Sequence, residues 1–178
     1  MACVFVDGRD LAIARRHVRS LLQPGQRRIH FHDERAGRRA MLLGSFASLP
    51  VRAVGFVVQR GHGTTEFHAR AAALAALVEE AQRRGVERLV LESRQDDRDD
   101  VATIERARQP EPQLRFEFRA GGDDPLLWLA DGITWAVAAG HEWSARVGPV
   151  LLGLRDVAPL TREARLPPPS GGQSGSLP

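Results

Sequence analysis

Lysine is absent from this sequence of 178 residues, so all 25 of its basic residues are arginines. The net charge is only +3, and the isoelectric point of about 10.6 follows from the use of arginine alone rather than from a large excess of positive charge. Arginine in place of every lysine is typical of a GC-rich genome. By itself it does not indicate a phosphate-binding function.

Cysteine and long apolar runs are also scarce. The single Cys3 excludes an internal disulfide, and its place in an apolar run predicts a buried, unreactive thiol rather than a nucleophile. No apolar run approaches the roughly 18 to 20 residues that cross a membrane. Charge at Asp7 follows the start too closely for a secretory signal peptide. These absences predict a cytoplasmic protein.

Several catalytic motifs are missing as well. The sequence has no glycine-rich phosphate loop, no nucleophile elbow and no Cys/His zinc pattern. The acids between Asp96 and Asp100 lack EF-hand spacing, so we interpret them as a solvated loop. A chain that is 43% hydrophobic can bury one core of this size, which predicts a single α/β domain over residues 1–156. The Pro-, Gly- and Ser-rich residues 157–178 are predicted to be a disordered tail.

The sequence does contain alternating strand-like and helix-like segments. Apolar runs predict strands at 3–6, 29–32, 51–58, 86–91 and 114–118. Helical spacing of apolar residues predicts helices that begin near 10, 36, 64 and 124, with a weaker helix within 96–107. Because a helix separates two strongly apolar runs, Val51–Val58 and Val86–Leu91, we expect a βαβ crossover and a partly parallel sheet.

Charge is unevenly distributed along the chain. The first forty residues hold nine arginines and four acids, 9 − 4 = +5, whereas Glu92 to Glu105 hold two arginines and six acids, 2 − 6 = −4. This polarity would orient an anionic partner near an acidic, metal-binding centre. The simpler interpretation is two solvated charged faces.

Two carboxylates lie where packing gives no reason for them. Glu92 ends a predicted buried strand, where ligands collect in open α/β sheets. Asp131 lies in a predicted helix on the same stripe as Trp128, Trp135 and Asp124, where poor solvation calls for a cation or hydrogen bonds. A bound Mg²⁺ would supply the cation.

Each of these acids also has a structural interpretation. Glu92 would pair with Arg94 or Arg98, and Asp131 would accept a hydrogen bond from an indole. Asp124 is most simply a helix N-cap, although we also count it as a candidate metal ligand. The alternating His30, His32 and Glu34 would share one side of an extended chain, as a metal site uses, but this is a weaker pattern.

Three segments together carry a family resemblance: LQPGQRRIHFHDE at Leu22–Glu34, LVLESR at Leu89–Arg94 and DPLLWLAD at Asp124–Asp131. With them, the chain from about Val4 to Val147 resembles the actinobacterial branch of an uncharacterised ribonuclease-H-like family, the domain of unknown function numbered three thousand eight hundred. The resemblance implies a ribonuclease-H-like mixed sheet with helices on both faces.

In folds of this type, as the resemblance implies, carboxylates from the first strand, a middle strand and the last helix bind Mg²⁺ or Mn²⁺ for phosphodiester hydrolysis. Glu92 matches the strand-end acid, Asp131 matches the last-helix acid, and His30 and Glu34 match a signature in an inserted segment. The chain departs from the family at its start, because the first strand with its acidic motif has no counterpart. We therefore expect an incomplete carboxylate site, since two-metal chemistry needs several carboxylates.

Three functions stay open on this reading. The first is a divalent-metal-dependent nuclease with an incomplete site built on Glu92 and Asp131. The second is a non-catalytic module that binds nucleic acid or a protein partner through its Arg-rich first forty residues. The third is an assembly module whose first strand comes from a neighbouring chain.

Overall fold

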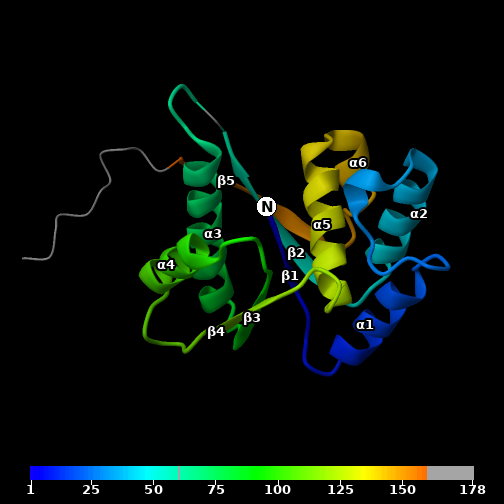
Figure 1. The fold of residues 1–178 in the computed structure, drawn as a ribbon, viewed down its shortest axis with the longest axis horizontal. Helices are drawn as coiled ribbons and strands as arrows, with labels where there is room; N and C mark the ends of the chain where they lie inside the picture. Colours follow the sequence, from blue (N-terminus) through cyan, green and yellow to red (C-terminus); the bar gives the residue numbers. More distant parts are fainter. Residues whose placement is uncertain (60, 160–178) are drawn as a thin grey trace, which may run out of the picture.

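Residues 1–59 and 61–159 are described by a computed structural model, in which strands and helices alternate (Figure 1). The predicted α/β class is confirmed. The strands are β1 (Ala2–Phe5), β2 (Arg52–Val58), β3 (Arg88–Glu92), β4 (Arg115–Arg119) and β5 (Leu151–Val157). The helices are α1 (Leu11–Ser20), α2 (Ala36–Ala47), α3 (Glu66–Arg83), α4 (Arg98–Ala107), α5 (Pro125–Ala138) and α6 (His141–Ala145), with a 3₁₀ turn η1 (Phe31–Asp33).

The strands form two sheets. The first has the order β1-β2-β5, with β1 antiparallel and β5 parallel to β2, and the second is the parallel pair β3-β4. The expectation of a partly parallel sheet is confirmed. The expected βαβ crossover within one sheet is wrong, because β1 and β5 occupy both edges of β2 and leave β3 to pair with β4.

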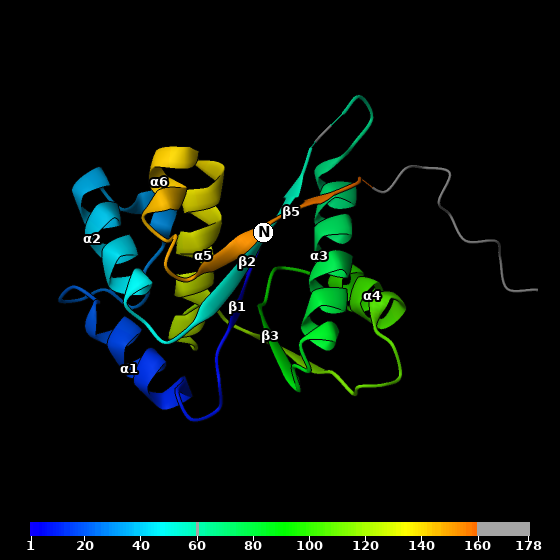
Figure 2. The same cartoon turned by 180° about the vertical axis from the view of Figure 1, so that it is seen from behind.

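Helices cover both faces of the strands, as predicted, and they connect the two sheets (Figures 1 and 2). One core cluster packs one face of β1 and β2 against α1, α2 and α5. The other cluster packs the opposite face of β1 and β2, together with β3 and β4, against α3 and α4. Cys3 belongs to the second cluster, and burial raises the pKa of its thiol to about 12, which agrees with an inert thiol.

The two long helices begin where the sequence predicts. The Thr65 side chain accepts a hydrogen bond of 3.2 Å from the backbone N–H of His68 and caps α3, which ends before Gly85 at a φ of 68°. The Asp124 side chain caps α5 ahead of Pro125. Both cap motifs fix the position of the residues that follow them.

The strand predicted over 29–32 is wrong. Ile29 and Phe31 are buried at 2% and 0% exposure, and the alternation with exposed His30 imitates a strand. The backbone instead turns, with the Asp33 N–H donating to the His30 carbonyl over 3.0 Å.

The boundary of the predicted tail is also corrected. Val157 ends β5 (Leu151–Val157), a strand that was not predicted from the sequence. The rest of the predicted tail, from residue 160 onward, lies outside the described residues. No helix within the described ranges is long and apolar enough to cross a membrane.

Candidate functional site

A small cleft of about 40 Å³ lies between the end of β3 and the first half of α5. Glu92, Asp131 and His30 all line it, together with Arg28 and the backbone of Gly121. The two carboxylates that sequence reasoning selected are therefore brought to one place from separate elements. His30 joins them from the chain just before η1.

Glu92 is the exposed acid of the cleft, with 45% of its side chain accessible. Its Oε1 lies 3.1 Å from Nη1 of Arg28, so the predicted partners Arg94 and Arg98 are wrong. A Cβ at residue 121 would overlap the Glu92 carboxylate and the Arg28 guanidinium. The missing side chain of Gly121 thus makes room for this pair.

Asp131 is half-buried on α5, and its Oδ2 accepts a hydrogen bond of 3.1 Å from the backbone N–H of Phe31. The predicted indole donor is wrong, because the Nε1 of Trp128 donates to the carbonyl of Gly121 instead. Trp135 is not among the residues that line the cleft, and its ring packs against Phe31 with centroids 5.4 Å apart. Asp131 therefore also holds the segment that carries His30 against α5.

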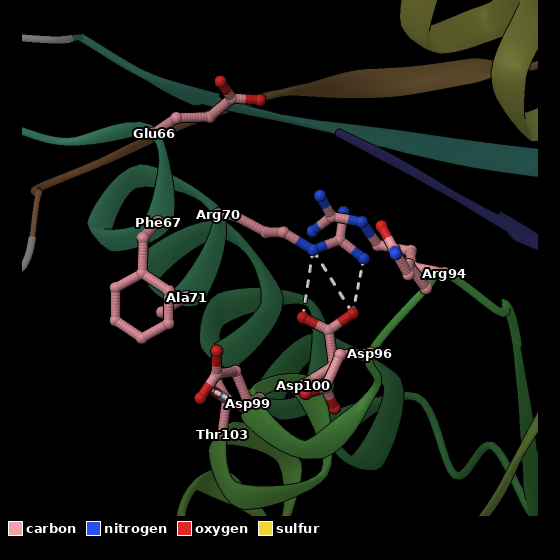
Figure 3. Close-up of a pocket in the computed structure, with 10 residues that line it drawn as sticks. Glu66, Phe67, Arg70, Ala71, Arg94, Asp96, Asp99, Asp100 and Thr103 are labelled. Carbon is pink, nitrogen blue, oxygen red and sulfur yellow. Dashed lines mark hydrogen bonds and ion pairs between the residues drawn. The ribbon is translucent and has the colours of Figure 1, made fainter.

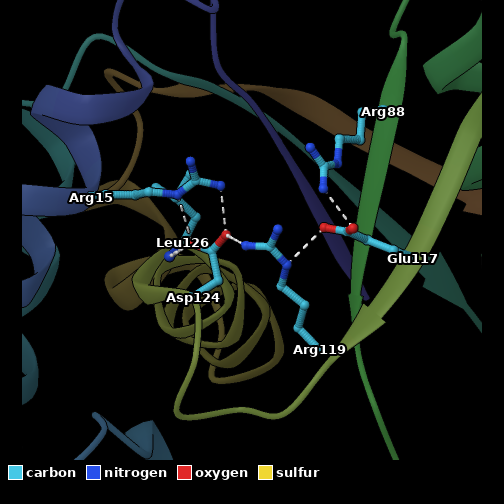
Figure 4. Close-up of polar contacts among 6 residues, drawn as sticks. All are labelled: Arg15, Arg88, Glu117, Arg119, Asp124 and Leu126. Atoms are coloured by element: carbon cyan, nitrogen blue, oxygen red, sulfur yellow. Dashed lines mark hydrogen bonds and ion pairs between the residues drawn. The ribbon is translucent and has the colours of Figure 1, made fainter.

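Asp124 belongs to a different cluster, shown in Figure 4. Its Oδ2 lies 2.6 Å from Nη2 of Arg15 and 3.2 Å from Nη1 of Arg119, and its Oδ1 accepts from the N–H of Leu126 at 3.1 Å. The N-cap interpretation is confirmed. Both of its oxygens are engaged by these donors, so we leave Asp124 out of the candidate metal site.

The same cluster continues onto the β3-β4 sheet. Nε of Arg119 forms an ion pair with Oε1 of Glu117 at 2.7 Å, and Oε2 of Glu117 accepts a hydrogen bond from Arg88 at 2.6 Å. Positive and negative groups therefore alternate from α1 to β3. Burial opposes ionisation of Asp124, but the hydrogen bonds and charge of Arg15, with smaller contributions from the Leu126 N–H and from Arg119, hold its pKa below the usual value. The hydrogen bond from Arg88 lowers the pKa of Glu117. Both carboxylates are stabilised in the charged form.

The histidine and glutamate signature does not converge. Oε1 of Glu34 accepts from Gln26 at 2.8 Å, and its Oε2 lies 3.5 Å from Nε of Arg38. The turn η1 replaces the extended chain that would have aligned His30, His32 and Glu34. Only His30 of the three lines the cleft.

The fit of a divalent cation to the cleft is partial. Across residues 1–59 and 61–159, no three His, Cys, Asp or Glu side chains are placed to hold a metal ion. Mg²⁺, however, commonly keeps several waters and is bound through one or two carboxylates plus phosphate oxygens of a substrate. Two carboxylates at the mouth of one cleft meet that lower requirement.

A larger cleft of about 380 Å³ lies between α3 and α4 (Figure 3). Asp100 is only 5% exposed there and receives a two-pronged contact from Arg70, with Nε–Oδ1 at 2.9 Å. The prediction of a solvated loop is therefore wrong for Asp100, which lies on α4. Because Arg70 and Asp100 neutralise each other, this cleft shows a structural ion pair that joins two helices.

Four of the nine arginines in the first forty residues contact other parts of the fold. Arg15 bonds Asp124, Arg28 bonds Glu92, and Arg38 donates to the backbone carbonyl of Leu21. Arg39 donates to the carbonyl of Phe31. These contacts give the four arginines a role in the fold, so the number of arginines alone does not indicate a surface for nucleic acid.

Searches of protein-family models, of curated proteins and of solved structures gave no match to this chain. The ribonuclease-H-like resemblance therefore remains a prediction from the sequence.

Proposed function

We propose that this chain is a ribonuclease-H-like domain whose cleft between β3 and α5 binds Mg²⁺ or Mn²⁺ together with a phosphodiester, on an incomplete set of carboxylates. The observation that carries the proposal is the placement of Glu92 and Asp131, which come from a strand end and from the last long helix and line the same cleft. The mixed strand directions and the helices on both faces are consistent with it.

Each residue of the cleft has a distinct role in this proposal. Glu92 and Asp131 would supply the oxygen ligands, and His30 would hydrogen-bond a water or a phosphate oxygen at the same opening. A divalent cation bound there would polarise the phosphodiester and activate a water. Arg28 neutralises Glu92 when no other cation does.

The cleft supplies few protein ligands, so cation affinity should depend on the phosphodiester. We expect weak Mn²⁺ binding to the protein alone and tighter binding when a short single-stranded oligonucleotide is present. Calorimetric titration with Mn²⁺, with and without the oligonucleotide, measures both affinities. In a parallel NMR titration, Mn²⁺ should broaden the signals of His30 and Gly121 before those of residues on α4.

Matched variants distinguish Mn²⁺ binding at the cleft from nonspecific attraction of Mn²⁺ to acidic side chains. Glu92→Gln and Asp131→Asn should each weaken Mn²⁺ binding about tenfold or more, which corresponds to ~1.4 kcal/mol. Glu87→Gln changes an exposed acid just before β3 and should leave binding unchanged. No Mn²⁺ binding to the folded protein, or equal affinity in all four proteins, would refute the proposed function.

A further inference from the structure

The outer edge of β1 has backbone groups without partners. Met1 and Phe56 exchange two backbone hydrogen bonds, of 3.0 and 2.7 Å. Because hydrogen-bonded and non-hydrogen-bonded pairs alternate along an antiparallel ladder, the next pair, Ala2 and Gly55, is not hydrogen-bonded. The N–H and C=O groups of Ala2 and Val4 therefore point away from β2. Among the described residues, no hydrogen-bond partner is found for these groups.

The outer edge of β3 is open in the same way. Ser93 donates to the Arg119 carbonyl over 2.7 Å, and Arg115 donates to the Glu87 carbonyl over 3.0 Å, so odd-numbered residues of β3 face β4. The backbone groups of Arg88, Val90 and Glu92 face the other side. Within the part of the chain that the structure describes, they too have no backbone partner.

These two edges face each other. Figures 1 and 2 show β1 and β3 as neighbouring strands of opposite direction between α3 and α5. Cys3 of β1 and Leu89 of β3 belong to the same core cluster under α3, and α5 contacts both strands on the other side. We call the facing edges of β1 and β3 the seam. The seam separates the two sheets, and α3 and α5 each cover strands of both.

Two valines beside the seam are less buried than the central residues of β2. In β2, which has neighbours on both edges, Ala53, Val54 and Phe56 are 0%, 3% and 2% exposed. In contrast, Val4 of β1 and Val90 of β3 are only half-buried. An apolar strand in the seam would complete their burial and satisfy both rows of backbone groups at once.

We propose that the seam binds an extended segment of a different polypeptide, apolar on its face toward α3, which pairs with β1 on one edge and β3 on the other. Because these strands run in opposite directions, the segment is parallel to one neighbour and antiparallel to the other. The backbone ladders would provide affinity, and the face toward α3, where Cys3 and Leu89 are buried, would select apolar β-branched side chains. The face toward α5 carries the charged Arg119 and Glu117, so alternate residues of the segment would be polar. This inference does not depend on the proposed metal site.

Two other occupants fit the geometry less well. The incoming strand must have both edges free, whereas every described strand is already paired on at least one edge, so a second copy has no suitable strand among its described residues. The sequence from Leu160 to Leu166 carries three charges in seven residues, and it is followed by three prolines. That composition opposes a buried strand.

Amide hydrogen exchange measured by NMR tests the seam directly. In the free protein, the amides of Cys3 and Leu91 should be protected by their ladders, whereas those of Val4 and Val90 should exchange rapidly. The probe is a synthetic peptide of alternating valine and threonine with Gly-Ser at each end. Adding it should slow exchange at Val4 and Val90 by about tenfold or more.

Two controls remove backbone hydrogen-bond donors, one from the peptide and one from the protein. The same peptide with N-methylated valines keeps the side chains and should not protect the amides. Val90→Pro removes the N–H that faces the seam without touching the β3-β4 ladder, and it should abolish binding while the protein stays folded. If that variant fails to fold, the N-methylated peptide still decides the question.

Three results would overturn the proposal. The first is equal protection of all four amides in the free protein, which would show that the seam is closed. The second is no protection by the peptide at millimolar concentration. The third is protection that rises with protein concentration alone, which would assign the seam to a second copy of the chain.

Discussion

The guanidinium Nη1 of Arg28 lies 3.1 Å from Oε1 of Glu92, although 64 residues separate them in the chain. Both side chains are about half exposed, at 45% each, so the contact is solvated and readily exchanged. Arg28 thus occupies the carboxylate that a divalent cation would use. A competition between the two cations follows from this single contact.

Replacing Arg28 by glutamine should therefore strengthen Mn²⁺ binding. The Arg28→Gln variant removes the competing charge and leaves Glu92 free, and we expect a gain of about threefold to tenfold in affinity, or ~0.7 to 1.4 kcal/mol. Calorimetric titration measures the change. Arg27→Gln removes a neighbouring exposed arginine and serves as the control. Weaker binding in Arg28→Gln would show that the arginine assists the site instead.

Gly121 offers a second way to change the cleft without changing a charge. A Cβ in the Gly121→Ala variant would displace the Glu92 carboxylate and the Arg28 guanidinium, which are the flexible ends of exposed side chains. We expect the free energy of unfolding to change by less than about 0.5 kcal/mol, because both side-chain ends can move into solvent. Mn²⁺ affinity should fall because Glu92 is displaced. Gly122→Ala, where a Cβ meets no atom within 4 Å, is the matched control.

Asp124 should make stability depend on pH. Its pKa lies below the usual value in the folded protein, so its contribution is fully present above the unfolded pKa of about 3.9 and is lost as the pH falls through the lower folded value. At pH 7, Asp124→Asn should cost about 1 to 3 kcal/mol of unfolding free energy. The difference from the wild-type protein should shrink as the pH falls below the unfolded pKa of about 3.9. Urea unfolding at a series of pH values measures it.

The neighbouring acid provides the control for this effect. Asp123 is exposed, so Asp123→Asn should leave the unfolding free energy within about 0.5 kcal/mol at every pH. A constant difference between Asp124→Asn and the wild-type protein from pH 7 to pH 2 would contradict the role of the charge. That result would attribute the loss of stability in Asp124→Asn to altered packing.

The elements predicted from the sequence were those whose pattern reflects local chemistry. The Thr65 cap and Gly85 enclose α3, and Asp124 with Pro125 opens α5, so these helices could be located without tertiary information. Glu92 and Asp131 could be selected because acids are unexpected at a strand end and on an apolar helix. Their common cleft follows from how β3 and α5 pack.

What the sequence missed depends on contacts between distant segments. The turn at Phe31 imitates a strand because two core side chains alternate with His30. The pairing of Glu92 with Arg28 rather than Arg94 requires the segment before η1 to fold back on β3. The strand β5 was not predicted, because Leu151, Leu152 and Leu154 form only a short apolar run interrupted by Gly153, and its pairing with β2 joins distant segments.

Glu80 is a buried acid that no pattern in the sequence marks. Glu80 on α3 is fully buried, yet it contacts Arg83 and Arg84 on its own helix, and its Oε2 lies 2.6 Å from Nη2 of Arg155 on β5. Glu80→Ala removes the anion that joins α3 to β5 and leaves a cavity. We expect the free energy of unfolding to fall by about 2 to 4 kcal/mol. This is less than the full cost of an unpaired buried charge, because the arginines that lose their partner are partly exposed.

Glu79→Ala is the matched control for this variant, because Glu79 is the exposed neighbour on the same helix and should change stability by less than about 0.5 kcal/mol. Thermal and urea unfolding of both variants measure the difference. If Arg155 carries the link between α3 and β5, Arg155→Ala should lower stability as well, and its effect should largely disappear in the Glu80→Ala background. Additive losses in the double variant would show that the two side chains act independently.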